Sequence, residues 1–339
     1  MNGHEAETIR EIATAFQKSR IFLTAYELGI FTFLGDTAQR SEEIAERLGT
    51  DPRATDRLLN ALCAIGLVEK SDNTFSNTPA AARFLVAGTS DYLAGFMHTV
   101  HLWDTWSTLT GAVREGTTVA GRRTGTAGDR WLSAFIAAMH DRGMKQAPAS
   151  IAGLDLTGVN RVLDVGGGSG AYAVAFVRSG QGIRATVVDL PSVIPLTRSY
   201  VDKEGLLDRI EFREGDYKRD SLGSGYDIAF LSAVVHSNSD AENRALLVKC
   251  AASVLPGGQV VVQDFIMDPD RTSPAHGTFF ALNMLVGTAG GDTYTEAEIR
   301  GWMEEAGLVE IKRINTPFQA TQIVGRRRKT GDEPSRGRN

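Results

Sequence analysis

The stretch Val162-Leu163-Asp164-Val165-Gly166-Gly167-Gly168-Ser169-Gly170 decides the fold. It begins as an apolar run typical of a buried strand and ends in four glycines within five residues, and a helix-compatible segment follows at 171–177. A strand, a glycine turn and a helix in this order let backbone N–H groups approach a ligand with no Cβ atom in the way. The apolar strand 185–188 then ends in Asp189, where a doubly wound fold binds ribose hydroxyls. The sequence therefore predicts a cofactor that contains a nucleoside.

Two cofactors fit this stretch. The spacing Gly166-x-Gly168-x-x-Ala171 fits the dinucleotide fingerprint of NAD enzymes. The same stretch, taken from the aspartate before the glycines, also has the spacing Asp164-x-Gly166-x-Gly168-x-Gly170. This spacing resembles the S-adenosylmethionine (SAM) loop of class I methyltransferases. A pyrophosphate binds best at a helix N-terminus with no carboxylate beside it. SAM carries an ammonium and a sulfonium instead of phosphates, so the carboxylate of Asp164 favours SAM over NAD.

The order of strands narrows the choice. From residue 160 the chain alternates strands and helices, which is typical of a parallel sheet covered on both faces. The last two strands are joined by the short turn 315–317, so we expect them to pair antiparallel. The fold class is therefore α/β, a seven-stranded Rossmann-like methyltransferase sheet with the last strand antiparallel, which disfavours NAD. The expected strands are 161–165, 184–188, 209–213, 226–232, 258–264, 308–314 and 319–325.

Residues 1–100 have the pattern of a mainly α-helical winged-helix domain. The expected elements are a helix at 5–30, a short helix at 41–49, a helix at 52–65 after the N-cap pair Asp51-Pro52, and a small β-wing at 67–76. A winged helix can bind DNA, but a DNA reader must neutralise phosphates. Residues 1–100 hold nine Lys and Arg against thirteen Asp and Glu, a net charge of −4. We therefore expect dimerisation rather than DNA binding.

Composition sets further bounds. The 339-residue chain is 42% hydrophobic and 23% charged with a net charge of −5, which is ordinary for a soluble globular protein and gives no electrostatic reason to expect a nucleic-acid partner. Cys63 and Cys250 form no CxxC pair and are expected to be buried thiols of a cytoplasmic protein. No apolar run reaches the roughly 18 residues of a membrane span, and the first ten residues lack a signal peptide's basic start, so no membrane partner is expected.

The remaining segments complete the domain plan. Residues 1–100 form the dimerisation domain, 101–150 a helical linker with substrate-pocket helices around a glycine-rich loop at 116–128, 151–325 the SAM-binding catalytic domain, and 326–339 a disordered basic tail. His98 and His101 are a possible metal pair. No third ligand lies near them in the sequence, so core or pocket-wall histidines are favoured and no metal is expected.

Four titratable residues follow the predicted strands. Asp189, Asp216, His236 and Asp264 lie at or just beyond the carboxyl ends of four of them. Ligands of such sheets bind at that edge. We therefore expect these residues, scattered along the chain, to converge on one site.

The ordered motifs resemble the O-methyltransferase family of plant caffeate and bacterial polyketide enzymes, which have an N-terminal winged-helix dimerisation domain. The resemblance covers residues 10–325. The motifs that carry it are LDVGGGSG at 163–170, VVDLP at 187–191, EGDY at 214–217, LSAVVHS at 231–237, LPGG at 255–258, VQDFIMD at 262–268 and YTEAEIRGWMEEAGL at 294–308.

The resemblance implies a homodimer, SAM as cofactor and a small-molecule acceptor. It assigns His236 as the general base and Asp264 as the acid that orients it. A neutral imidazole with a free pKa of about 6.5 can accept the proton of a phenol whose pKa is about 10 as the oxygen attacks. The cofactor-binding residues that it implies are Asp164, Gly166, Gly168, Asp189, Leu190, Asp216, Tyr217 and Ser232.

The sequence departs from the plant enzymes at three positions. Ser232 stands where they have a lysine, and Ser237 stands where an aspartate follows the base. After Gly290-Gly291 they carry a second glutamate, whereas this chain has Asp292 followed by Thr293. Either Asp292 substitutes for that glutamate, or Asp264 orients the base alone.

The acceptor is expected against a mostly apolar wall in which Asn283 supplies one directional hydrogen bond. The predicted wall residues are Trp103, Phe135, Met139, Phe279, Asn283 and Met284; core packing is the competing interpretation for each apolar one. The sequence thus predicts methyl transfer to a hydroxyl of an aromatic or hydrophobic small molecule. Methyl transfer to carbon or nitrogen, or SAM binding without turnover by a regulatory protein, are the alternatives.

Overall fold

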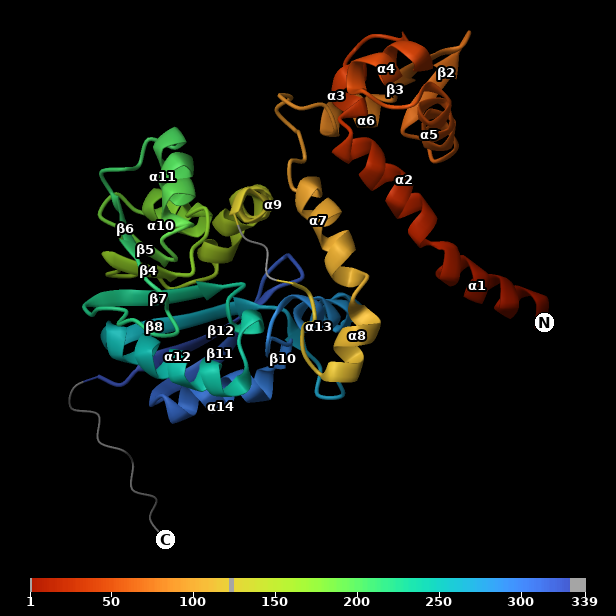
Figure 1. The fold of residues 1–339 in the computed structure, drawn as a ribbon. Coiled ribbons are helices and arrows are strands. Elements are labelled where there is room, and N and C mark those ends of the chain that lie inside the picture. Colours follow the sequence, from red (N-terminus) through yellow and green to blue (C-terminus); the bar gives the residue numbers. More distant parts are fainter. Residues whose placement is uncertain (1, 122–124, 330–339) are drawn as a thin grey trace. The chain divides into compact units, whose positions relative to one another are not determined.

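The computed structural model describes residues 2–121 and 125–329 (Figure 1). It forms two compact units, Met1–Asp104 and a second unit that begins at Thr105, and the boundary falls within α7 (Phe96–Trp106). In the described ranges, no helix is long and apolar enough to cross a bilayer.

The N-terminal unit contains the predicted winged-helix elements. The side chain of Asp51 accepts a hydrogen bond of 2.8 Å from the Ala54 amide and caps α5, as its position before Pro52 indicated. The wing strand β3 pairs antiparallel with both β1 and β2. The elements are α1 (Asn2–Thr14), α2 (Phe16–Glu27), α3 (Ile30–Leu34), β1 (Gln39–Arg40), α4 (Ser41–Leu48), α5 (Pro52–Ala64), β2 (Val68–Ser71), β3 (Thr74–Asn77) and α6 (Pro79–Phe84).

The single helix expected at 5–30 is divided. A break at Ala15 separates α1 from α2, and α2 ends at Glu27. Gly29 then takes a φ of +75°, a left-handed value that glycine adopts without strain, and α3 begins behind it. The apolar period continues through these breaks, and for this reason the sequence pattern did not show them.

The second unit is built on the predicted seven-stranded sheet, in the order β11-β12-β8-β7-β4-β5-β6. Its strands are β4 (Arg161–Val165), β5 (Arg184–Asp189), β6 (Ile210–Glu214), β7 (Tyr226–Ser232), β8 (Val254–Asp264), β11 (Leu308–Asn315) and β12 (Thr321–Arg327). β12 runs antiparallel to both of its neighbours, β8 and β11, and the other neighbouring strands of the sheet pair parallel. The strand order reverses between β4 and β7, and ligands bind at such a switch point beyond the carboxyl ends of the strands.

Each face of this sheet packs into its own hydrophobic core. Successive residues of a strand point to opposite faces, so Leu163 joins the core with Trp302 and Leu247, whereas Val162 joins the core with Phe176. The other elements are α8 (Leu109–Glu115), α9 (Gly125–Ala152), α10 (Ala171–Ser179), α11 (Ile194–Lys203), η1 (Val235–Ser237), α12 (Asp240–Ser253), β9 (Ile266–Met267), α13 (Ala275–Gly287), β10 (Tyr294–Thr295) and α14 (Glu296–Glu305).

Two expectations for this unit need correction. The loop predicted at 116–128 is shorter, because α9 already begins at Gly125. The tail predicted to be disordered from 326 instead begins inside β12, where the Arg327 guanidinium donates a 2.6 Å hydrogen bond to the Val254 carbonyl. The rest of that tail, 330–339, lies outside the described residues.

Candidate active site

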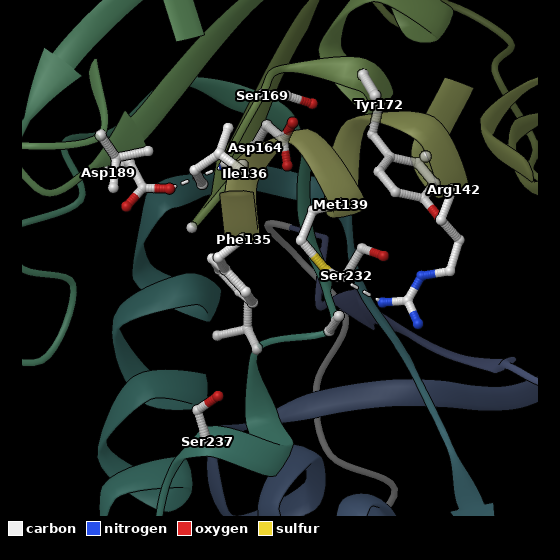
Figure 2. A pocket seen from close by; sticks show the side chains of 18 of the residues that line it. Phe135, Ile136, Met139, Arg142, Asp164, Ser169, Tyr172, Asp189, Ser232 and Ser237 are labelled. Atoms are coloured by element: carbon white, nitrogen blue, oxygen red, sulfur yellow. Dashed lines mark hydrogen bonds between the residues drawn. The ribbon is translucent and has the colours of Figure 1, made fainter. Parts of the chain in front are cut away.

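A cavity of about 510 Å³ opens at the carboxyl ends of the central strands, beside α9 (Figure 2). It brings together residues that the sequence placed at five different strand ends, whereas His236 is not among the residues that line it. The predicted residues that line it are Asp164, Gly166, Gly168, Asp189, Leu190, Asp216, Tyr217, Ser232, Asp264, Phe135 and Met139.

The glycine loop folds closely over a buried acid. A Cβ atom on Gly167 would lie 2.7 Å from Cγ of Asp164 and 2.9 Å from Cγ1 of Val187. Such distances are shorter than non-bonded carbon atoms allow. Glycine at position 167 therefore lets the loop cross directly above Asp164.

Asp189, at the end of β5, is hydrogen-bonded to the backbone of the glycine loop. Its Oδ2 accepts a 2.8 Å hydrogen bond from the Gly168 amide, and its Oδ1 accepts one of 2.8 Å from the Leu190 amide. Burial raises the pKa of this carboxyl, and the two amide hydrogen bonds oppose that rise. A carboxylate oxygen can accept two hydrogen bonds, so each oxygen keeps capacity for one ribose hydroxyl.

Asp164 offers a buried negative group to the same cavity. It is 1% exposed, and its Oδ2 has no hydrogen-bond partner among the described residues. Burial raises its pKa to about 7, with a smaller contribution from the nearby Asp189. An unpaired buried carboxylate oxygen is costly, and a cation in the cavity would stabilise its charged form.

Stability should therefore depend on pH through Asp164. Because its pKa rises from 3.8 to about 7 on folding, the folded ligand-free protein binds more protons than the unfolded chain between these values. The free energy of unfolding then falls as pH rises through that window, by about 2–4 kcal/mol. Urea unfolding at about pH 5 and pH 8 should show this fall in the wild type and not in Asp164→Asn. Equal pH dependence of the two proteins would contradict this assignment.

His236 and Asp264 form a hydrogen-bonded pair at the ends of β7 and β8. The Nδ1 of His236 lies 2.8 Å from Oδ1 and 3.0 Å from Oδ2 of Asp264, which also accepts a 2.8 Å hydrogen bond from the Phe265 amide. An ionised carboxylate only accepts, so Nδ1 carries the proton and Nε2 is left as the basic nitrogen. The ring of Phe280 packs against the imidazole in a T-shaped contact, with 4.8 Å between the ring centroids.

A buried polar network supports the floor of the cavity. The Gln263 amide of β8 donates to Tyr172 Oη at 2.7 Å and to Ser232 Oγ at 3.0 Å. Its carbonyl accepts a 2.9 Å hydrogen bond from Gln322 of β12, which also donates to the Ser150 carbonyl of α9. Ser232 is thus fixed by the neighbouring strand.

Comparison with known proteins identifies the family of this chain. The family described as O-methyltransferase domain matches residues 106–309, and the family described as O-methyltransferase dimerisation domain matches residues 10–87. The chain belongs to the O-methyltransferase family. It is a SAM-dependent methyltransferase with an N-terminal dimerisation domain.

Individual relatives of this methyltransferase span nearly its whole length. It is 33% identical to 3-hydroxy-5-methyl-1-naphthoate 3-O-methyltransferase of Streptomyces sahachiroi, over 90% of each chain. It is 31% identical to the tetracenomycin polyketide synthesis 8-O-methyl transferase TcmO of Streptomyces glaucescens, over 94% of this chain and 96% of that one. The solved structure of an O-methyltransferase family protein from Burkholderia thailandensis matches with a TM-score of 0.86 and 25% identity, over 96% of this chain and 99% of that one.

The second acid of this methyltransferase is engaged elsewhere. The carboxylate of Asp292 lies 3.3 Å from the Arg271 guanidinium and accepts a 2.8 Å hydrogen bond from the Thr293 amide. Asp292 reaches His236 only through its backbone, by donating its amide N–H to the His236 carbonyl at 3.0 Å. Of the two arrangements left open by the sequence, this geometry favours orientation of the base by Asp264 alone.

The cavity lining includes only part of the predicted acceptor wall. Phe135 and Met139 line the cavity, and Trp131 stacks on Phe135 with 5.4 Å between ring centroids. Trp131, Ile136 and Arg142, which were not among the predicted wall residues, also line it. The 3.6-residue period of α9 could have predicted these residues, because residues three, four and seven positions apart share one helix face with Phe135 and Met139.

The α13 residues lie outside the lining of this cavity. Phe279 is 64% exposed, whereas its neighbour Phe280 packs against His236. Met284 is buried, and Oδ1 of Asn283 accepts a 2.9 Å hydrogen bond from the Trp106 indole, which leaves the Asn283 amide NH₂ as its donor. Phe280 therefore replaces Phe279 as the α13 aromatic residue beside the candidate base.

Trp103 and the histidine pair belong to the part of α7 that falls in the N-terminal unit. Trp103 lies in the N-terminal unit, where the Arg20 guanidinium stands 5.4 Å from its ring centroid, so its role at the acceptor stays a prediction. His98 and His101 also lie in that unit. Across the described part of the chain, no group of three His, Cys, Asp or Glu side chains could hold a metal ion.

Proposed function

We propose that this methyltransferase acts on a hydroxyl of an aromatic or hydrophobic small molecule, with His236 as the general base. The hydrogen bond of 2.8 Å between His236 Nδ1 and Asp264 carries the proposal, because it fixes the protonated nitrogen and leaves Nε2 to accept a proton. The two relatives named above transfer methyl groups to oxygen, as their names state.

The residues divide the work of the reaction. When bound, SAM supplies an activated methyl group on a sulfonium. Asp189 positions the ribose and Asp164 the positively charged end, while Phe135 and Met139 align the acceptor. His236 Nε2 takes the hydroxyl proton as the oxygen gains the methyl group, and the carboxylate of Asp264 stabilises the imidazolium that forms. General base catalysis contributes roughly 10²–10⁴ in rate, and the remainder comes from alignment of the reacting atoms.

Matched acceptors test the proposal. Purified protein with SAM should convert 2-naphthol to its methyl ether, detected by mass spectrometry as the gain of one methylene. It should leave 2-naphthylamine and naphthalene unchanged, because the amine lacks an acidic hydroxyl and naphthalene lacks any acceptor heteroatom. Methylation of the amine or of ring carbon in place of the hydroxyl would contradict O-methylation and support the alternatives.

We also propose that the protein is a homodimer through its N-terminal domain. The dimerisation-family match supports this, and so do three apolar side chains on α1 and α2, Ile9, Ile12 and Phe16, which are 68%, 73% and 55% exposed. Exposed apolar groups clustered on one segment are typical of protein interfaces. Sedimentation equilibrium measures the mass directly, and a monomer at micromolar concentration would exclude the proposal.

A cytoplasmic location is our proposal for its place in the cell. Both cysteines are free thiols, Cys250 buried and Cys63 partly buried, as expected where disulfides do not form. The acidic net charge of −5 offers no attraction to nucleic acid or to anionic lipid. Cell fractionation tests this location, and recovery with membranes would contradict it.

A further inference from the structure

Arg142 is a cation that the mechanism does not use. It lines the cavity from α9, and its Nη2 donates a 3.3 Å hydrogen bond to Sδ of Met139. No ion pair ties its guanidinium to a carboxylate within the described part of the chain. Figure 2 shows it beside Tyr172, on the opposite side of the view from Asp189.

The helix itself directs this side chain into the cavity. Phe135, Met139 and Arg142 are spaced four and three residues apart, so they share the face of α9 that borders the cavity. Arg142 therefore faces the bound reactants together with the acceptor wall.

The charges around Arg142 determine what kind of group it can bind. Four aspartates line the cavity, namely Asp164, Asp189, Asp216 and Asp264. The other cation of the lining, Lys218, already lies 2.9 Å from the Glu242 carboxylate. An anionic group would be repelled over most of this cavity and stabilised beside Arg142. A guanidinium matches the two oxygens of a carboxylate, and pairing of this kind is strong where water is partly excluded.

We propose that Arg142 binds a carboxylate of one of the two reactants. Two sources share that chemistry: the amino-acid end of SAM, and an acid group on the aromatic acceptor. The second source rests on the proposed function, and it would make aromatic hydroxy acids the substrate class. The first depends only on the cofactor.

Two pairs of ligands separate the sources by calorimetric titration of the full-length protein. S-adenosylhomocysteine and S-adenosyl-3-thiopropylamine differ only in the carboxylate of the cofactor. With S-adenosylhomocysteine bound, 3-hydroxy-1-naphthoate and 2-naphthol differ only in the carboxylate of the acceptor. In Arg142→Ala, we expect the carboxylate member of one pair to lose about 10- to 100-fold in affinity, while the counterpart that lacks the carboxylate stays within about twofold.

Matched variants control for charge and folding. Lys218→Ala removes the other cation of the lining, and its carboxylate preference should be that of the wild type. Arg142→Lys should recover part of the loss, and Arg142→Gln replaces Arg142→Ala if thermal unfolding shows that the alanine variant does not fold.

Each outcome decides the proposal. A selective loss in the adenosyl pair assigns Arg142 to the cofactor, and a selective loss in the naphthalene pair assigns it to an acidic acceptor. If neither pair shows a selective loss, including the case in which no naphthalene ligand binds, the proposal is overturned. Absence of methyl transfer to any hydroxyl would overturn the proposed function instead, and the result for the adenosyl pair would still stand.

Discussion

His236→Asn is expected to lower kcat for methyl transfer about 10²- to 10⁴-fold and to leave the affinity for S-adenosylhomocysteine within about twofold. The amide side chain can keep the hydrogen bond to Asp264, but it has no nitrogen that accepts a proton at neutral pH. The loss therefore falls on proton transfer rather than on cofactor binding. Single-turnover rates with saturating SAM measure it without interference from product release.

Two acids provide the comparison for this result. Asp264→Asn should also lower kcat strongly, because the imidazole loses the acceptor that fixes its tautomer and the charge that stabilises the imidazolium. Asp292→Asn should change kcat by less than about threefold, since its carboxylate contacts Arg271 rather than the imidazole. An unchanged kcat in His236→Asn would remove the general base from the mechanism, and a large effect in Asp292→Asn would restore the second acid.

Asp189→Ala should weaken S-adenosylhomocysteine binding by about 10²- to 10⁴-fold. Two hydrogen bonds from ribose hydroxyls to a charged carboxylate are worth about 1.5–3 kcal/mol each, and both are lost. The same substitution releases the Gly168 and Leu190 amides, so the glycine loop also loses its anchor at the end of β5. Calorimetric titration measures the change.

Asp227 supplies a matched control at the other end of the strands, where the parallel strands begin. Its Oδ2 also accepts two backbone hydrogen bonds, of 2.8 Å each, from the amides of Asn160 and Arg161. It stands near the start of β7, away from the carboxyl ends where the cavity opens. Asp227→Asn should leave the affinity within about twofold. Equal affinity in wild type and Asp189→Ala would show that the ribose binds elsewhere.

The sequence predicted correctly that residues from several strand ends line one cavity. The residues concerned follow strands, and the carboxyl ends of parallel strands meet at one edge whatever the details of packing. Asp189 and Asp264 are 75 positions apart, yet both line one cavity. Strand periodicity and a fixed topological rule are enough to bring such residues together.

The helical surroundings of the cavity and of His236 were harder to predict, because they depend on which face of each helix is turned toward them. Adjacent helical residues point about 100° apart, so Phe279 is exposed while Phe280 packs against His236. An apolar segment such as 279–285 does not reveal which face meets the site. Likewise, the carboxylate of Asp292 contacts the guanidinium of Arg271, which lies 21 positions away in the sequence. Only the folded structure shows that these two residues are close together.

The hydrogen bond between Gln322 and Gln263 places a constraint on how the enzyme is made. A ribosome delivers β12 after the other six strands of the sheet, although β12 lies between β8 and β11 and not at the edge. Until it emerges, β8 presents an unpaired backbone edge, which is a site for aberrant pairing with other chains. Until then, the side-chain carbonyl oxygen of Gln263 also lacks the hydrogen bond that Gln322 donates to it. Insertion of β12 therefore completes both the sheet and the hydrogen-bond network that holds Ser232, in a single late step. How long the edge of β8 stays exposed to aberrant pairing during translation depends on how quickly β12 inserts.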